Sequence, residues 1–575
     1  MFLNNSYVNL WQFYFSSELP CSHCNLFVRF DYSERRSVLK HQTFYQWIFI
    51  CTIGLSLIGC GGEKKDSASG DNSKPEYGGT LIYAKNGPPI SLDPAATKET
   101  ESSVIVASIF DGLVEQQAGK AAINPALAKS WNISKDGLTY TFNLRSGVTF
   151  HDGTPFNADA VLFSFNRQKD PKHPGYTTRD AFEYWKNFDM DKVVRTIAAV
   201  NDSTVEFKLS KPDATFLNLL TINFAAIVSP EAVKKYKNDF YKNPVGTGAF
   251  KFSSWNDDGS VVCVAFENFM NGRPYADTLV FKPISDGHQR WLELKAGTVN
   301  MMSTPGQADL AEIENTSGVK MAKQHGINVA YLAMNMSKKP FTDLRVRQAI
   351  VYAINREHLV KEVYGQLGRA AKNPIPPVLL GYNEEIRFTP YNPEKSKELL
   401  KEAGFPNGFK TKLLSLPIVR EYMPNGQLTA EFIQKELKAV GIEVEIVSYE
   451  WKEVLARRER GEHELALAGW VGDAPDPHFF FFPLLDKVNA KNVGSTNAAS
   501  YKSEEMHNLI EKGKITFEPV ERSNVYKKAC EIFNKDLPWF TIAHSVSIVP
   551  MRDNVMDFVL HSSSVRKFDK VWLKK

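Results

Sequence analysis

The residue types that most often carry catalysis or bind metals are scattered through this sequence. The 575-residue chain has 12 histidines and six cysteines, and its histidines form no compact cluster. His151 stands beside Asp152, but no nucleophile or metal partner is placed with the pair, so we expect a structural histidine. Gly246 and Gly248 lack the helix-opening context and the following Lys-Ser/Thr of a phosphate-binding loop, so they predict a tight turn. These patterns favour a protein that is not an enzyme and that needs no cofactor or metal.

Cys60 is the cysteine whose setting predicts chemistry, namely lipidation after export. The stretch 47–59 has no charged residue, and Lys40 and His41 precede it. Its 13 residues are too few for a spanning helix, which needs about 20, but they are typical of a signal peptide. The segment ends in Leu-Ile-Gly before Cys60, as in a bacterial lipobox, where the cysteine is acylated and becomes the first residue of the mature chain.

The sequence around this signal predicts three N-terminal parts. Residues 1–59 form the signal-peptide region, within which 1–37 indicate a mis-called translation start, because a signal peptide normally begins with its basic residues. Residues 60–77 are polar after the cysteine and predict a flexible tether between the lipid and the folded body. Cys21 and Cys24, which are half of a zinc site at most, would then be absent from the protein.

The composition of the chain is that of an ordinary folded protein. Hydrophobic residues make up 43% and charged residues 23%, with a formal net charge of +4. No run of Lys and Arg is long enough to predict a nucleic-acid partner. The body keeps only Cys263 and Cys530, which we interpret as a buried pair of free thiols.

Short strands and amphipathic helices alternate along the body. Alternating apolar residues predict strands at 79–85, 140–145, 204–209 and 441–449. Helices are expected at 344–353, at 393–404 after the cap residue Asn392, and at 428–440. The expected class is therefore α/β.

Several segments of the body resemble the peptide/nickel family of ABC-transporter solute-binding proteins, which is family 5. The longest runs from Asn124 to Phe156, and Pro244 to Phe250 (PVGTGAF) is similar to the family's Gly-rich turn. Phe341 to Leu359 is similar to its helical landmark. The resemblance extends from about Gly78 to the C-terminus. It implies an α/β, two-lobed periplasmic-binding-protein fold (type II, Venus-flytrap) with an extra subdomain in lobe one.

The second half of the chain is similar to the dipeptide-binding branch of that family. Leu416 to Asn425 (LPIVREYMPN) and Ala468 to Phe480 (AGWVGDAPDPHFF) carry this similarity. In that branch an aspartate of a Gly-Trp-x-x-Asp element binds the peptide ammonium, and an arginine of a Pro-x-x-Arg-x-Tyr element binds the peptide carboxylate. The resemblance therefore implies that Asp473 binds the ammonium and Arg420 the carboxylate.

Elementary chemistry agrees with these two roles. A dipeptide is a zwitterion whose charges lie about 6–7 Å apart when extended. One carboxylate and one guanidinium would fix both ends, and the planar fork of arginine suits a carboxylate. We expect Trp470 and Tyr422 to supply apolar walls and a hydroxyl, and the backbone near Gly472 to supply hydrogen bonds. The phenylalanine run 479–482 is interpreted as buried scaffold.

The resemblance also implies domain boundaries and a closing motion. Residues 78–283 and 543–575 form lobe one, with the extra subdomain near Trp131 to Phe156, and residues 284–542 form lobe two. Asp473 and Arg420 both lie on lobe two by this division. The ligand would bind there first, and the lobes would then close over it about a hinge.

The predicted protein is an extracytoplasmic lipoprotein of an ABC importer that captures dipeptides or short peptides and delivers them to a membrane permease. It would act as a monomer in the periplasm or at the cell surface. Other cargo on the same fold stays open: haem, 5-aminolevulinate, a nickel chelate or a longer oligopeptide. A receptor or chaperone without transport is another alternative. An exported hydrolase would need a Ser/Cys-His pair or a metal triad, and none stands out.

Overall fold

A long mixed sheet organises the protein in the computed structural model. The structure describes residues 74–575 except 98, 118–121, 178–181, 492–494, 562 and 564, and these residues belong to one compact unit. The predicted signal peptide, Cys60 and most of the tether lie outside the described residues. The strand order of the sheet is β16-β15-β17-β13-β18-β11-β1-β10-β9-β8, and β12 and β14 also pair with β18. Its strands are β1 (Thr80–Lys85), β8 (Phe250–Trp255), β9 (Val261–Ala265), β10 (Thr278–Pro283), β11 (Met301–Met302), β12 (Val319–His325), β13 (Asn328–Met334), β14 (Gly368–Ala370), β15 (Lys410–Leu414), β16 (Glu443–Val447), β17 (Leu465–Val471) and β18 (Trp539–Arg552).

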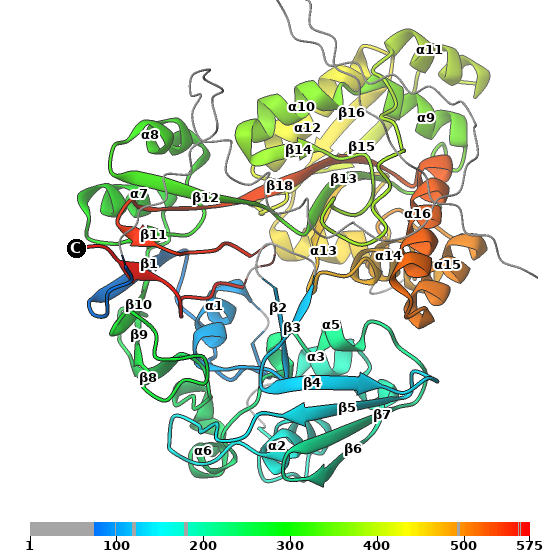
Figure 1. Cartoon of the computed structure of the whole chain (residues 1–575). Helices are drawn as coiled ribbons and strands as arrows, with labels where there is room; N and C mark the ends of the chain where they lie inside the picture. Colours follow the sequence, from blue (N-terminus) through cyan, green and yellow to red (C-terminus); the bar gives the residue numbers. More distant parts are fainter. Residues whose placement is uncertain are drawn as a thin grey trace, which may run out of the picture. The chain divides into compact units, whose positions relative to one another are not determined.

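Strand β18 joins the two halves of this sheet. Its first part pairs with β13 and β14, and its second part pairs with β11 and β12. Figure 1 shows the strand running from the half that holds β13 to the half that holds β1. Nearly all of its 14 side chains are buried, so both halves pack against a single segment.

A separate antiparallel sheet follows the first helix and has the order β4-β5-β7-β6. Side chains of β5 and β7 alternate between buried and less buried positions, as expected for a sheet that covers a core with one face. The predicted subdomain segment from Trp131 to Phe156 contains β5. The strands outside the long sheet are β2 (Val114–Gln116), β3 (Ile123–Pro125), β4 (Ala128–Ile133), β5 (Thr139–Leu144), β6 (Val194–Asn201), β7 (Thr204–Leu209), β19 (Val555–Met556) and β20 (Trp572–Leu573).

The helices begin where local capping chemistry allows. The Asn392 side chain accepts a hydrogen bond from the Lys395 N–H, and Pro393 occupies the first turn of α11, as predicted. The predicted helices at 344–353 and 428–440 are also confirmed, as α9 and α12. No helix in the described part of the chain is long and apolar enough to cross a bilayer. The α-helices are α1 (Thr100–Ile109), α2 (Ala158–Lys169), α3 (Glu183–Asn187), α4 (Met190–Val193), α5 (Phe216–Leu219), α6 (Pro230–Tyr236), α7 (Gly287–Ala296), α8 (Leu310–Asn315), α9 (Leu344–Ala353), α10 (Arg356–Tyr364), α11 (Pro393–Glu402), α12 (Gly426–Lys438), α13 (Trp451–Glu459), α14 (His478–Leu485), α15 (Glu504–Ile515) and α16 (Pro519–Asp536). The 3₁₀ turns are η1 (Asn223–Ala225), η2 (Lys237–Lys242), η3 (Gln307–Asp309), η4 (Gly365–Leu367) and η5 (Lys487–Asn489).

Buried apolar side chains form four clusters rather than one. The largest, which we call the main core, takes its residues from 327–543, and a second takes them from 95–227 with Ala474 and Phe479. A third joins residues of 81–281 to Met301 and 549–571, and a fourth joins Ala84 to residues 291–313. Separate cores of this kind provide the physical basis for two lobes, whose limits stay a prediction.

The Gly-rich turn at 244–250 brings the chain close to the end of α1. The Gly248 N–H donates to the Ile109 carbonyl at 2.9 Å, and a Cβ on Gly248 would lie 2.5 Å from the Ser108 carbonyl oxygen. His151 is buried and its Nε2 lies 2.8 Å from the Gly248 carbonyl oxygen. The predicted structural histidine is therefore confirmed. The two glycines form a bend rather than a tight turn, and they allow the backbone to approach the end of α1 closely. Cys263 and Cys530 are buried and free, as predicted.

Candidate functional site

Two predicted site residues lie in loops that follow neighbouring strands of the long sheet at the same edge. Strands β15 and β17 are parallel neighbours, with Leu414 opposite Ala466. Arg420 lies in the loop that follows β15, and Asp473 lies in the loop that follows β17. Carboxyl ends of neighbouring parallel strands are the usual place for a ligand site in α/β sheets. The chain therefore brings both loops to one edge although more than fifty residues separate them.

Asp473 is a partly buried carboxylate with a single neutral partner. Its Oδ1 accepts a hydrogen bond from the Tyr184 hydroxyl at 3.2 Å, and within the described ranges no Lys or Arg forms an ion pair with it. Burial raises the pKa of Asp473, and the Tyr184 hydrogen bond offsets only part of that effect. The site thus holds an acidic group that lacks a cation.

Tyr184 of α3 is a site residue that the sequence did not reveal. Its ring stacks on Phe188, with centroids 5.6 Å apart, and lies 6.1 Å from the ring of Phe224. Phe188 in turn contacts Phe479, which follows the Asp473 loop. Burial, and then the nearby Asp473 charge, raise the pKa of Tyr184, so its hydroxyl keeps its proton and donates. Tyr184 and Asp473 are 289 positions apart, and no local pattern marks the pair.

Arg420 is held as an unpaired cation. Its backbone forms a narrow turn, in which the N–H groups of Arg420 and Met423 each donate to the other residue's carbonyl, at 3.1 and 2.9 Å. The guanidinium carbon lies 4.3 Å from the ring centroid of Trp451, the first residue of α13. Its buried Nε has no hydrogen-bond partner, and no carboxylate of the described chain pairs with it. The indole plane orients the guanidinium and leaves its donors unused.

The remaining predicted residues pack around these two loops. Tyr422 is buried, and its ring lies so close to Gly469 of β17 that a Cβ at Gly469 would overlap it. The indole N–H of Trp470 donates to the Phe479 carbonyl at 2.8 Å. The N–H of Gly472 donates to the Ile327 carbonyl at 2.8 Å. This N–H is therefore already used, and the backbone group of Gly472 that remains for a ligand is its carbonyl.

The phenylalanine run after this loop divides between two cores. Phe480 and Phe481 belong to the main core, whereas Phe479 belongs to the second core. The run is therefore mainly buried scaffold, as predicted, and it also connects the Asp473 loop to the aromatic rings around Tyr184.

Asp476 anchors the same loop. Its carboxylate accepts two hydrogen bonds from the Arg522 guanidinium of α16, at 2.6 and 2.9 Å, and one from the Asn218 amide at 3.1 Å. Both members of the ion pair are buried. Burial lowers the pKa of Arg522, but the Asp476 charge more than offsets this and the net shift is upward. The shape of the loop around Asp476 therefore depends on an arginine that is 46 positions away.

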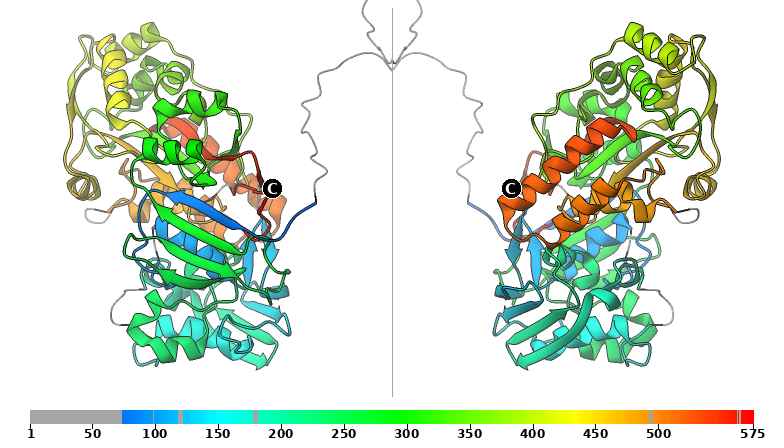
Figure 2. Two further views of the ribbon diagram at one scale, coloured as in Figure 1. Left: turned by 90° about the vertical axis from the view of Figure 1, so that its left-hand side faces the viewer. Right: turned by 90° about the vertical axis from the view of Figure 1, so that its right-hand side faces the viewer.

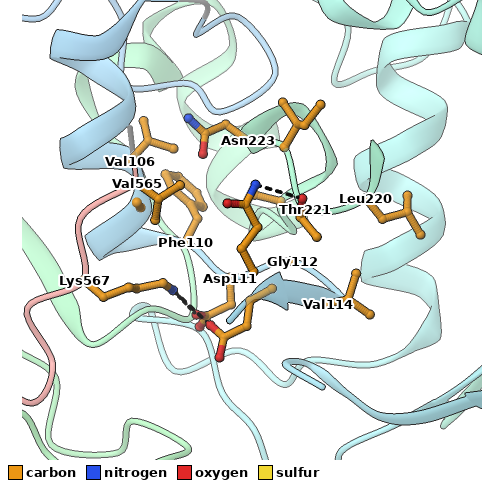
Figure 3. A pocket seen from close by; sticks show the side chains of 15 residues that line it. Val106, Phe110, Asp111, Gly112, Val114, Leu220, Thr221, Asn223, Val565 and Lys567 are labelled. Carbon is orange, nitrogen blue, oxygen red and sulfur yellow. Dashed lines mark hydrogen bonds and ion pairs between the residues drawn. The ribbon is translucent and has the colours of Figure 1, made fainter. Parts of the chain in front are cut away.

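A small pocket lies beside the segment that carries Phe224, and Figure 3 shows its lining side chains. Lys567 reaches two carboxylates there, Glu115 at 3.4 Å and Asp111 at 3.6 Å. The pocket volume is about 50 Å³, whereas ligand sites usually measure about 300–1,000 Å³. The single ammonium of Lys567 offsets one of the two carboxylate charges, and the pocket contains none of the predicted site residues.

Comparison with known proteins identifies the family. Residues 122–492 match the family model of bacterial extracellular solute-binding proteins, family 5 Middle. The chain is 38% identical to heme-binding protein A of Haemophilus influenzae over 506 residues, which cover 86% of this chain and 92% of that protein. It is 35% identical to the dipeptide-binding protein of Escherichia coli over 509 residues, which cover 86% of this chain and 94% of that protein.

A solved structure agrees in sequence and in fold. The periplasmic binding protein DppA from Helicobacter pylori, in complex with peptide STSA, matches with a TM-score of 0.74 and 36% identity. The match covers 87% of this chain and 99% of that one. The predicted two-lobed α/β fold of the type II periplasmic binding proteins is therefore confirmed. Such proteins are extracytoplasmic substrate-binding components of ABC transporters and are not enzymes. The chain thus belongs to family 5 of the bacterial extracellular solute-binding proteins.

Proposed function

We propose that this protein captures short peptides with free ends, dipeptides first among them, in a cleft between its lobes and delivers them to an ABC permease. The observation that carries the proposal is the pair of unpaired opposite charges, Asp473 and Arg420, at one edge of the long sheet. A buried charge without a partner is costly, so each residue stabilises a ligand group of opposite sign. A zwitterionic peptide supplies both groups.

Each residue has a defined task in this proposal. Asp473 accepts the peptide ammonium while its Oδ1 keeps the hydrogen bond from the Tyr184 hydroxyl. Arg420 binds the peptide carboxylate with both arms of its fork, while Trp451 fixes the plane of the guanidinium. Trp470 and Tyr422 line the side-chain space, and the Gly472 carbonyl accepts from a peptide N–H. Relatives named for dipeptides support this cargo, and a relative named for haem makes haem the competing ligand.

Isothermal titration calorimetry tests the cargo. The ligands are Ala-Phe, its N-acetylated form, a tripeptide, the tetrapeptide STSA, nickel-histidine and haem. Asp473→Ala and Arg420→Ala should each weaken Ala-Phe binding at least about 30-fold, because loss of one partner of a buried charge pair costs about 2–5 kcal/mol.

Arg345→Ala is the matched control, because Arg345 forms an exposed ion pair with Asp343. It should leave peptide affinity unchanged. The proposal fails if the acetylated dipeptide binds as well as the free one, or if both site variants bind Ala-Phe normally. Tight binding of haem with no response to peptides would replace peptide with haem as the cargo.

The proposal includes export, a lipid anchor at Cys60 and action as a monomer. The leader-like apolar segment before Cys60 and the polar tether after it support the anchor. In a bacterial host, Cys60→Ser should release the protein from the membrane fraction and abolish its labelling by a palmitate analogue. Labelling that persists in the variant would contradict the anchor at Cys60. Light scattering of the purified protein should give the mass of one chain.

A further inference from the structure

A second cluster of chemically capable side chains lies away from the peptide site, between the end of α14 and the start of α15. Asp486, His507 and Glu511 each offer one ligand atom, and these atoms all lie within 4.8 Å of one another. The His507 Nδ1 lies 3.0 Å from each carboxylate oxygen of Asp486. Glu511 follows His507 by four positions on α15, so both side chains lie on one face of that helix.

From this geometry we infer that Asp486, His507 and Glu511 form a zinc site. An imidazole with two carboxylates is a ligand set that zinc accepts, and a fourth position remains for water. Bonds of about 2.0–2.2 Å place tetrahedral ligand atoms about 3.3 Å apart, close to the separation of His507 and Asp486. Glu511 is exposed, and its ligand atom lies within 4.8 Å of the other two, so an unpacked side chain completes the set.

The charges around the cluster favour a divalent cation. The Asp486 carboxylate is fully buried, and besides His507 its only described partner is the Val488 N–H at 2.9 Å. No Lys or Arg of the described chain forms an ion pair with Asp486 or Glu511, and the nearby Lys487 pairs with Glu504 instead. Zinc binding requires the imidazole in its neutral form, and the two carboxylates then carry a charge of −2, which the zinc ion neutralises.

The surroundings hold the buried ligand in place. The Asn497 amide donates to the backbone carbonyl of Asp486 at 3.2 Å and to that of Tyr501 at 3.0 Å. This amide fixes the end of α14 against the segment that leads into α15. Polar groups that orient ligands in this way are typical of metal sites. The inference does not depend on which solute the protein transports.

Zinc titration of the purified protein tests the site. Calorimetry should show one zinc equivalent that is lost or weakened at least tenfold in His507→Gln and in Glu511→Gln. The four cysteines outside the described residues can also bind zinc, so a parent with serine at positions 21, 24, 51 and 60 is the background for every variant. Glu511 is exposed, so Glu511→Gln keeps the test valid even if His507→Gln destabilises the fold.

The chain offers a matched control pair. His358 and Glu362 have the same four-residue helical spacing on α10, but no buried aspartate completes them. His358→Gln should leave zinc affinity unchanged. Cobalt should bind at the same stoichiometry and give a visible absorption band that His507→Gln removes. The inference is overturned if the parent binds no zinc, if both site variants bind it as the parent does, or if calcium binds in zinc's place.

Discussion

Asp473, the proposed ligand of the peptide ammonium, carries a cost to stability. Its raised pKa means that the ligand-free fold is stabilised by this group below the pKa of the unfolded chain, and that this contribution is lost as pH rises through the folded pKa. At neutral pH the unpaired carboxylate therefore destabilises the empty protein. Residues that serve ligands commonly show this trade-off.

Asp473→Asn should raise the melting temperature of the ligand-free protein at pH 7 by about 1–2 °C. The amide keeps the Tyr184 hydroxyl as a partner and carries no charge to desolvate. The gain should be smaller at pH 4 than at pH 7, because the wild-type carboxyl takes up its proton as pH falls and its pKa lies above the ordinary value. Calorimetric scans at both pH values check this. A variant that melts below the wild type at pH 7 would show that the Asp473 charge stabilises the empty fold.

The peptide affinity should depend on pH through the same group. Binding of an ammonium requires the carboxylate, so the affinity for Ala-Phe amide should fall as pH drops through the Asp473 pKa, which lies above its ordinary value. The amidated ligand has no carboxylate of its own to titrate. Calorimetry from pH 7 to pH 4 measures the slope. An equally steep slope in Asp473→Asn would assign the effect to another group.

Local sequence marks the two charged residues of the proposed site but not the partners that hold them. Asp473 and Arg420 stand in short elements with a recognisable pattern of Gly, Trp and Pro. Tyr184, and the stacking of Arg420 on Trp451, depend on packing between distant segments, which no spacing rule predicts. The zinc ligand Asp486 is likewise far from His507 in sequence, and only the packing of α14 on α15 brings them together.

At the scale of elements, the Asp473 loop depends on α16. Figure 2 shows α15 and α16 side by side, and Arg522 reaches from α16 to Asp476. Arg522→Ala would leave the buried Asp476 carboxylate without its cation. It should lower the free energy of unfolding by about 3–5 kcal/mol and weaken peptide binding. Urea unfolding measures the first effect and calorimetry the second.

Lys512→Ala is the control for that substitution. Lys512 of α15 forms an exposed ion pair with Glu521 of α16, at 3.3 Å. Its loss should cost less than about 1 kcal/mol. If Arg522→Ala costs no more than Lys512→Ala, the buried pair does not anchor the loop.

Helices with a polar cap and an apolar face were predictable, because those signals lie within a few residues. The capped helices α9 and α11 are examples. β18 was not predicted, because its partners on β12 and β13 are more than two hundred residues away and its two parts belong to different halves of the sheet. The fourth core was not predictable for the same reason. It joins Ala84 of β1 to side chains of α7, which is far from β1 in the sequence.

At the scale of the molecule, three hydrogen bonds join the neighbourhood of the second core to that of the main core. Tyr184 donates to Asp473, Asn218 donates to Asp476, and the Ala214 N–H donates to the Lys514 carbonyl at 2.7 Å. We expect them to part when the lobes open and to form again when they close.

Small-angle scattering should therefore show a smaller radius of gyration with Ala-Phe than without it. Asp473→Ala should not respond to the dipeptide. An identical scattering curve with and without ligand, at saturating peptide, would contradict closure by hinge motion.

The long strand β18 also sets an order of events in the life of the chain. It lies between β13 and β11 in the sheet, yet it is among the last segments to be synthesised. Until Trp539 to Arg552 has emerged, both halves of the sheet have a gap and exposed apolar edges. We therefore expect a chain that crosses a membrane before its synthesis ends to stay unfolded there, and to complete its sheet only after the C-terminal segment has followed.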